Sequence, residues 1–274
     1  MDILYDSHVH TTHSEHPAVE KATMEEQLLK GIQLGLQRIY FTDHTEIGFP
    51  QPLPETYNPS VTMPKYYGEF QERKEQFSGR ITPMFGIELG FCDTNVEATR
   101  KLIEGYAFDF VMGSMHHMAD WPHFRGAAAW DGLTKGEVQA HYIETFLRIL
   151  GQYDDVDVLA HITYFARMCP FPDNEIRFLD APDHFDTLFR WLIQRGKGIE
   201  INTSSYGEKG FFLPGESVVS RYRELGGEIL TVGSDAHGSS TLGCHLREAY
   251  ELMQAVGFSH YTIYENRKPV FIKL

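Results

Sequence analysis

The sequence predicts an α/β fold, a closed barrel of seven parallel strands that is related to the TIM barrel but has one unit fewer. Short apolar runs of strand length alternate along the chain with longer segments whose apolar residues recur at helical spacing. Seven such pairs fit within the 274 residues. Units of this length favour parallel strands joined by crossover helices.

The expected elements follow this alternation. The strands are apolar runs followed by polar or glycine-rich turns: Ile3–Val9, Arg38–Thr42, Ile81–Leu89, Phe110–Met115, Val156–His161, Gly198–Asn202 and Glu228–Gly233. The helices have apolar residues three and four positions apart: Met24–Leu34, Pro64–Phe77, Val96–Tyr106, Lys135–Leu150, His184–Arg195, Glu216–Leu225 and Leu242–Ala255. An open, doubly wound sheet is the alternative, but no GxGxxG or GxxxxGK(S/T) pattern follows a strand.

Two long segments lack periodicity. Glu46–Met63 is rich in proline and is expected to be a loop beside the second strand, where it could cover a site as a lid. His117–Leu133 is the second irregular stretch. No change in composition marks a linker, so residues 1–274 are expected to form a single domain.

Composition limits the classes of function. A hydrophobic content of 42% is sufficient for a large core, and the net charge of -14 argues against binding nucleic acid through its phosphates. A phosphorylated substrate remains compatible, because bound metal ions reverse the local field. Three widely spaced cysteines indicate no disulfide framework. No signal peptide or long apolar run is present, which predicts a cytoplasmic protein without a membrane partner.

Histidines and carboxylates gather where the expected strands end. An HxH pair places two imidazoles on one face of the first strand, because residues i and i+2 of a strand point the same way. Six of the seven strands end in such residues: His8 and His10, Asp43 and His44, Glu88, His116, His161, and Asp235 and His237. The carboxyl ends of parallel barrel strands form one face, where active sites are built. One such histidine could be a buried core residue, but the set as a whole predicts a metal site.

The residue types indicate which metals and which chemistry. Imidazole nitrogen together with carboxylate oxygen suits zinc, manganese or iron. Only a carboxylate can bridge two ions, so Glu88 or Asp235 is required if the ions lie close together. Closely spaced ions acidify a shared water and clamp a phosphoryl group. The sequence therefore predicts a metal-dependent hydrolase.

The pattern resembles the polymerase and histidinol phosphatase (PHP) superfamily. The matching segments are Asp6-Ser-His-Val-His-Thr11, Phe41-Thr-Asp-His44, Gly86-Ile-Glu88, Gly113-Ser-Met-His116, His161 and Gly233-Ser-Asp-Ala-His237. Leu159-Ala-His161 followed by Arg167, and Ile199-Glu-Ile-Asn-Thr-Ser204, are more similar to its histidinol-phosphate phosphatase branch. The resemblance implies a distorted seven-stranded barrel and a single PHP-type metal-dependent phosphatase domain.

The resemblance also implies a ligand set for three divalent ions, which would be zinc, iron or manganese. The first ion is expected at His8, His10, Glu88 and Asp235. The second is expected at Glu88, His116 and His161, so that Glu88 bridges the two. The third is expected at His16, His44 and His237, and His13 competes with His16 for its place.

Further roles follow from the same resemblance. Asp43 is expected to hold a ligand imidazole in position, and Arg167 to clamp the phosphate, with Lys209 as a weaker candidate for that clamp. Asp43, His237 or a metal-bound water would protonate the leaving alkoxide. The expected reaction is hydrolysis of L-histidinol phosphate to L-histidinol and phosphate in histidine biosynthesis, with a metal-bridging hydroxide as nucleophile. The sequence makes no prediction of oligomeric state.

Three alternatives stand beside this interpretation. The amidohydrolase superfamily shares the HxH motif but often has a bridging lysine at the end of strand four, where this chain has Ser114-Met115-His116. A structural domain that has lost its ligands is the non-enzymatic alternative, but every expected ligand is present. A PHP phosphoesterase acting on a phosphotyrosine protein or a nucleotide is the serious rival. Phosphate release from histidinol phosphate would distinguish it.

Overall fold

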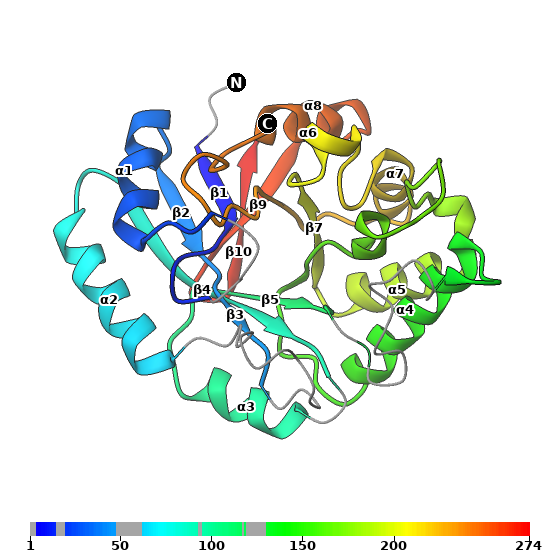
Figure 1. Cartoon of the computed structure of the whole chain (residues 1–274), viewed down its shortest axis with the longest axis horizontal. Helices are drawn as coiled ribbons and strands as arrows, with labels where there is room; N and C mark the ends of the chain where they lie inside the picture. Colours follow the sequence, from blue (N-terminus) through cyan, green and yellow to red (C-terminus); the bar gives the residue numbers. More distant parts are fainter. Residues whose placement is uncertain (1–3, 15–19, 48–61, 93–94, 117, 119–129) are drawn as a thin grey trace.

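Seven strands run parallel around a barrel in the computed structural model, and helices surround it (Figure 1). The structure describes residues 4–14, 20–47, 62–92, 95–116, 118 and 130–274. The strands occur in the order β1-β2-β4-β5-β6-β7-β8. Their bounds are β1 Tyr5–Val9, β2 Arg38–Phe41, β4 Thr82–Gly90, β5 Phe110–Ser114, β6 Val158–Leu159, β7 Gly198–Asn202 and β8 Leu230–Gly233.

Contacts between the first and last strands close the barrel. The backbone N–H of Asp235 donates to the carbonyl of His8 at 2.8 Å, and that of His10 donates to the carbonyl of Ala236 at 2.8 Å. Val9 and Ala236 form a parallel bridge. The predicted seven-stranded, TIM-like barrel is therefore confirmed, and the open-sheet alternative is wrong.

The second strand continues beyond its expected end. After β2 the chain passes through Thr42 and Asp43 and then pairs again with β4 as the short strand β3 (His44–Thr45). In this register His44 lies opposite Glu88. The extension therefore places an imidazole next to the carboxylate that the sequence predicts to bridge two ions.

The outer helices agree with the expected ones to within a few residues. Their bounds are α1 Met24–Leu34, α2 Met63–Gln76, α3 Val96–Glu104, α4 Lys135–Leu150, α5 Pro182–Gln194, α7 Glu216–Glu224 and α8 Leu246–Ala255. Capping boxes start two of them, with Thr23 and Glu26 before α1 and Thr134 and Glu137 before α4. Short helical turns not expected from the sequence are η2 Tyr164–Arg167, η3 Phe178–Asp180 and α6 Tyr206–Lys209.

A C-terminal hairpin was not predicted. It consists of β9 (His260–Glu265) and β10 (Lys268–Lys273), which are joined by Asn266 and Arg267, both with positive φ. The hairpin lies at the amino ends of the barrel strands, where Tyr40 donates to the carbonyl of Tyr264 and Arg267 pairs with Asp157. It is thus on the end of the barrel opposite to the predicted ligands.

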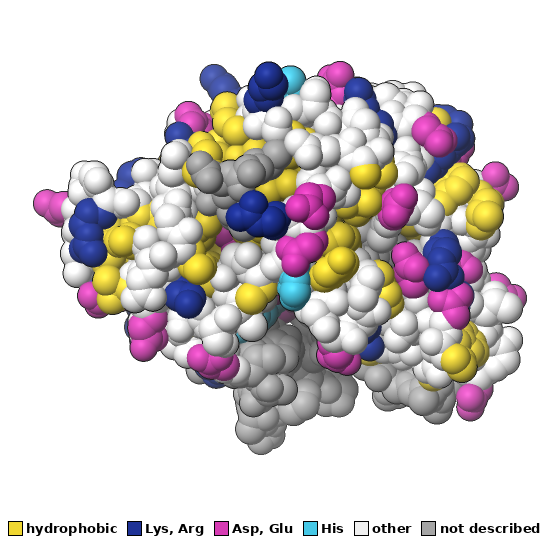
Figure 2. Space-filling model, turned by 90° about the horizontal axis from the view of Figure 1, so that it is seen from above, with side chains coloured by type: hydrophobic (Ala, Val, Ile, Leu, Met, Phe, Trp, Pro, Cys, Tyr) yellow, Lys and Arg dark blue, Asp and Glu magenta, His cyan; other side chains and the backbone are white. Residues whose placement is uncertain are grey.

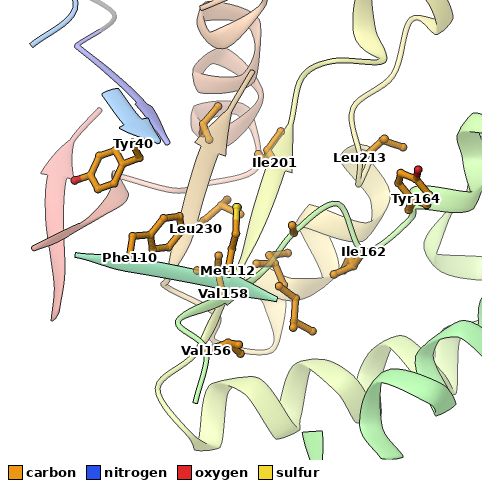
Figure 3. Close-up of a cluster of buried hydrophobic side chains, with 14 of the residues drawn as sticks. Tyr40, Phe110, Met112, Val156, Val158, Ile162, Tyr164, Ile201, Leu213 and Leu230 are labelled. Carbon is orange, nitrogen blue, oxygen red and sulfur yellow. The ribbon is translucent and has the colours of Figure 1, made fainter. Parts of the chain in front are cut away.

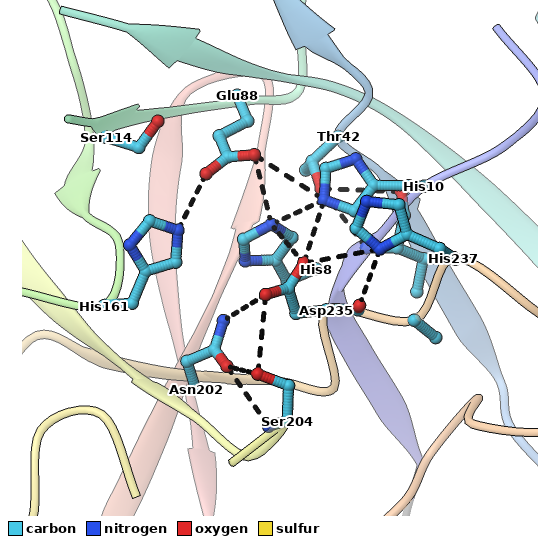
Figure 4. Close-up of polar contacts among 12 residues, drawn as sticks. His8, His10, Thr42, Glu88, Ser114, His161, Asn202, Ser204, Asp235 and His237 are labelled. Carbon is cyan, nitrogen blue, oxygen red and sulfur yellow. Dashed lines mark hydrogen bonds and ion pairs between the residues drawn. The ribbon is translucent and has the colours of Figure 1, made fainter. Parts of the chain in front are cut away.

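The barrel interior changes from apolar to polar along its axis. Phe110 and Met112, two residues apart on β5, lie in the buried cluster that Figure 3 shows with Val158 and Leu230. Ser114, the next residue of that face, lies beside Glu88 and His161 in Figure 4. The apolar layers below therefore support a polar site at the carboxyl ends. In the described part of the chain, no helix is long and apolar enough to span a membrane.

Candidate metal centre

The predicted ligands converge at the carboxyl ends of the strands (Figure 4). Four groups of three residues have ligand atoms within 4.8 Å of one another. The groups are His10, His44 and His237; His8, His10 and Glu88; His8, His161 and Asp235; and His44, Glu88 and His116. Together they contain eight of the nine predicted ligands, and the ninth, His16, lies outside the described residues.

Glu88 lies at the centre of the cluster and is fully buried. Its Oε2 atom is 2.6 Å from His44 Nδ1 and 3.5 Å from His8 Nε2. Its Oε1 atom is 2.9 Å from His161 Nε2 and 3.3 Å from His116 Nε2. The two oxygens thus face two separate sets of imidazoles, which is the arrangement that a carboxylate bridging two cations needs.

The donor set fits divalent cations. The Nε2 atoms of His8 and His10 are only 2.9 Å apart, and Asp235 Oδ1 is 3.2 Å from His10 Nε2. Glu88 Oε2 and His44 Nδ1 are buried 2.6 Å apart without the geometry of a hydrogen bond, and among the described residues neither atom has another hydrogen-bond partner. Buried polar atoms without partners are costly, and a cation would satisfy the converging nitrogens and oxygens together.

At His10 and Glu88 the pKa shifts favour the metal-binding forms, whereas nearby carboxylates outweigh burial and raise the pKa of His8 and His116 well above the usual value. Burial lowers the pKa of His10 well below its usual value, and the neighbouring imidazoles of His44 and His237 lower it further. Burial alone would raise the pKa of Glu88, but His44 and His116 outweigh it and hold that pKa well below the usual value. Neutral imidazoles and ionised carboxylates are the forms that bind metal.

Two ligand strands end in the left-handed backbone region. His161 has a φ of 29° and Asp235 a φ of 55°. Residues other than glycine adopt such values rarely and at some cost in free energy. Here the conformation turns each side chain back toward the cluster as its strand ends. Backbone strain therefore coincides with two of the predicted ligands.

Two buried carboxylates orient ligand imidazoles from behind. Glu200 Oε1 accepts a hydrogen bond from His8 Nδ1 at 2.7 Å, and its Oε2 accepts from the backbone N–H of His161 at 3.1 Å. Glu46 Oε1 is 2.6 Å from His116 Nδ1. A proton held on Nδ1 leaves Nε2 free to bind a metal. These contacts position His8 and His116 in the rotation that the cluster needs.

The family assignment follows from a match to the motif-bearing part of the chain. The sequence model of the PHP domain matches residues 6–204, from the second residue of β1 to just beyond the end of β7. The chain belongs to the PHP domain family. The resemblance predicted from the sequence is confirmed.

Curated relatives cover nearly the whole chain. A probable histidinol-phosphatase of Clostridium acetobutylicum is 27% identical and aligns over 99% of this chain and 97% of its own length. A histidinol-phosphatase of Lactococcus lactis is 24% identical over 93% of each chain. The solved structure of the histidinol phosphate phosphatase of Lactococcus lactis, in complex with zinc, L-histidinol and phosphate, superposes with a TM-score of 0.84 at 24% identity. It covers 97% of this chain and 98% of its own, and it shows that the fold is shared.

Sequence reasoning missed the two orienting carboxylates of this PHP domain. Glu200 lies in a segment that carries the resemblance, but no role was predicted for it. It is two residues before Asn202 on β7, so both point inward, and this spacing could have indicated it. Glu46 was expected at the start of an irregular loop. Its contact with His116 joins residues 70 positions apart, which no local pattern reveals.

Asp43 is bonded to the turn that follows β1. Its Oδ1 accepts from the backbone N–H of Thr11 at 2.7 Å and from the Ser14 hydroxyl at 2.7 Å, and its Oδ2 accepts from the Thr11 hydroxyl at 2.9 Å. The predicted contact with a ligand imidazole does not occur among the described residues. With three donors from one turn, the carboxylate instead fixes the turn that follows β1.

Arg167 lies at the edge of the cluster, whereas Lys209 does not. Arg167 donates to Asp235 Oδ2 at 2.7 Å and to the Ser204 hydroxyl. Lys209 pairs with Glu208 at 3.6 Å, and no described contact joins it to the cluster. Of the two candidates for the phosphate clamp, Arg167 therefore lies at the metal centre and Lys209 lies away from it on α6.

The histidines of the third predicted site are partly in place. His237 donates from Nδ1 to the backbone carbonyl of Asp235 at 3.1 Å, and its ring stacks on His10 at 4.2 Å between centroids. His13, the competitor of His16, is bonded through Nε2 to Glu69 at 2.7 Å and belongs to none of the four groups. The rings of His44 and His237 also lie near each other, with centroids 5.6 Å apart.

Glu200→Gln is expected to weaken metal binding and to lower kcat by about 10- to 100-fold. Both oxygens of Glu200 accept hydrogen bonds, so an amide NH₂ would face a donor and turn His8 away. Metal affinity by chelator competition and steady-state kinetics measure the effect, with Glu200→Asp as a partial rescue. The matched control is Glu144→Gln, which removes the charge of a carboxylate that pairs with His184 on the surface. Equal behaviour of the two variants would contradict the orienting role.

Proposed function

We propose that this PHP domain is a histidinol-phosphate phosphatase that hydrolyses L-histidinol phosphate to L-histidinol and phosphate. The observation that carries the proposal is the position of Arg167, which is held against Asp235 at the edge of an eight-residue ligand cluster. A phosphate at this edge would meet metals on one side and a guanidinium on the other. Relatives named histidinol-phosphatase, aligned over nearly the full chain, support the choice of substrate.

Three divalent ions, of zinc, iron or manganese, are proposed as cofactors. His8, His10, Glu88 and Asp235 would hold the first, and Glu88, His116 and His161 the second. The third would be held by His44 and His237, together with the predicted ligand His16. Bound there, the ions would acidify a water and neutralise charge on the phosphoryl oxygens.

The protein side chains have separate tasks in this reaction. Arg167 would donate two parallel hydrogen bonds to phosphate oxygens, which suits its planar guanidinium. Glu200 and Glu46 would keep His8 and His116 in their binding orientation through the Nδ1 contacts. His237, with its Nδ1 proton on the carbonyl of Asp235, presents Nε2 toward the cluster.

The surroundings of the site suit a small substrate. A cavity of about 420 Å³ lies beside Asp235 and His237, a volume in the range of small-molecule sites. Figure 2 shows acidic and basic side chains interspersed on one side of the molecule, without a continuous basic surface on that side. The rival substrates, a phosphotyrosine protein or a nucleotide, are not favoured by the relatives. We place the reaction in histidine biosynthesis and the protein in the cytoplasm.

Phosphate release tests the proposal directly. The metal-loaded enzyme is expected to hydrolyse histidinol phosphate with a kcat/KM at least about tenfold above that for p-nitrophenyl phosphate, a phosphotyrosine peptide or a nucleoside monophosphate. These compounds share the phosphate ester and differ in the rest of the molecule. Equal rates on all of them, or faster hydrolysis of the peptide, would refute the substrate assignment while leaving the metal centre intact.

Arg167→Ala is expected to raise KM for histidinol phosphate by about 10- to 100-fold, because a charged hydrogen bond to phosphate is lost. Arg167→Lys keeps the charge beside Asp235 but not the planar guanidinium. Its KM should therefore lie between those of the wild type and Arg167→Ala. Lys209→Ala is the control, since Lys209 pairs with Glu208 rather than with the cluster. Wild-type kinetics for Arg167→Ala would exclude the clamp.

A further inference from the structure

The cavity beside the metal centre is built from separate parts of the chain. Its wall includes the predicted ligands Asp235 and His237 and, away from them, Glu20, Gly207, Gly238 and His245. Glu20 precedes α1, Gly207 lies on α6, and Gly238 and His245 lie between β8 and α8. A substrate whose phosphate is on the metals would therefore place the rest of the molecule against these residues.

Glu20 is the carboxylate of this wall that is not a predicted metal ligand. Among the described residues that line the cavity there is no lysine or arginine, and the two carboxylates are Asp235 and Glu20. Asp235 is already engaged by Arg167 and by His10. Glu20 thus supplies negative charge to the part of the cavity that lies away from the predicted metal ligands and Arg167.

Glu20 is exposed, and hydrogen bonds join it and its segment to the loop that carries His237. The Ser240 hydroxyl donates to Glu20 Oε2 at 2.5 Å. Two residues further along, the backbone N–H of Ala22 donates to the carbonyl of His237 at 2.8 Å. The segment that carries Glu20 is therefore bonded to the same loop that carries the ligand candidate His237.

Gly238 allows the close approach of this carboxylate. A Cβ atom at position 238 would lie 2.6 Å from the Cδ atom of Glu20, which is too short for a real contact. Any larger residue at that position would displace the carboxylate from its place. A substitution at Gly238 would therefore displace the negative charge of Glu20 without removing it.

From these contacts we infer that Glu20 binds the ammonium group of the substrate and so selects aminoalkyl phosphate esters. The inference rests on the proposed function, because histidinol phosphate carries an ammonium group near its phosphate ester. An ammonium ion at Glu20 would gain a charge-assisted hydrogen bond in a cavity that otherwise offers it no carboxylate free of Arg167. An ester without the amine would lose this contact and keep those to the phosphate.

The test compares two substrates on matched variants of the holoenzyme. The substrates are histidinol phosphate and 3-(imidazol-4-yl)propyl phosphate, which has the same carbon skeleton with a hydrogen in place of the amino group. Glu20→Gln keeps an acceptor for Ser240 and removes the charge. It is expected to lower kcat/KM for histidinol phosphate by about 10- to 100-fold, mainly through KM, and to change that of the analogue by less than about twofold. Gly238→Ala should likewise lower kcat/KM for histidinol phosphate more than kcat/KM for the analogue.

The control is Glu208→Gln, which removes the charge of an exposed carboxylate on α6, next to the cavity residue Gly207 but outside the cavity lining. It should leave both substrates at wild-type values. A loss on both substrates alike in Glu20→Gln, or no loss on histidinol phosphate, would overturn the role of Glu20 and leave the proposed function standing. A wild-type enzyme that hydrolyses neither substrate faster than p-nitrophenyl phosphate would overturn both.

Discussion

Glu88→Gln should release metal and lower kcat by at least about 10²-fold. Glutamine keeps the shape of the side chain, but it removes the negative charge and replaces one oxygen by an NH₂ group. The Oε1 and Oε2 atoms lie within 3.5 Å of His116, His161, His8 and His44, so either orientation of the amide puts a donor where a ligand oxygen is needed. The effect should therefore reach both of the proposed ion sites that share Glu88.

Elemental analysis and steady-state kinetics on the same preparation measure this effect. Wild type is expected to contain about three ions per chain, and Glu88→Gln fewer than two. Glu97→Gln is the control, because Glu97 is 70% exposed on α3 and belongs to none of the four ligand groups. Circular dichroism should show that both variants keep the wild-type secondary structure. Near-normal turnover with a full metal complement would exclude Glu88 as a bridge.

The parts of the fold that depend on local signals could be predicted. Helices α1 and α4 begin where expected because apolar residues at helical spacing are a short-range pattern, and capping boxes at Thr23 and Thr134 start both helices. The barrel strands were recognised because apolar runs of strand length are followed by polar or glycine-rich turns. Helix α8 begins four residues later than expected, at Leu246, because residues 239–245 form turns before it.

The parts of the fold and of the site that depend on tertiary contacts could not be predicted from the sequence. The β9–β10 hairpin turns at Asn266 and Arg267, without the glycine that usually marks such a turn. The pairing of Glu200 with His8 joins residues 192 positions apart, and it becomes evident only when β1 and β7 are in one barrel. The resemblance implied that Asp43 holds an imidazole. Its carboxylate accepts hydrogen bonds from Thr11 and Ser14, which lie 32 and 29 positions away, and no local pattern reveals these contacts.

Removing the metals should abolish turnover and destabilise the fold. In the cluster, His8 and His10 bring two Nε2 atoms within 2.9 Å of each other, and Glu88 and Asp235 are held ionised although they are buried. Ions bound to the folded chain stabilise it by mass action, by about 4 kcal/mol per site when the free ion is at 1,000 times its Kd. For a chain of this size that corresponds to a fall in Tm of about 10 °C or more in the metal-free protein.

Chelation followed by dialysis and thermal unfolding tests this expectation. Zn²⁺ or Mn²⁺ should restore both Tm and phosphate release, because imidazole and carboxylate ligands suit them. Ca²⁺ is the matched control, since it has the same charge but prefers sites made of oxygen ligands alone. Acid should act like chelation, because protons compete for the imidazole nitrogens that must be neutral to bind metal. A metal-free protein, verified by elemental analysis, that unfolds at the wild-type temperature would show that the cluster is stable without ions and that the converging nitrogens and oxygens serve the fold alone.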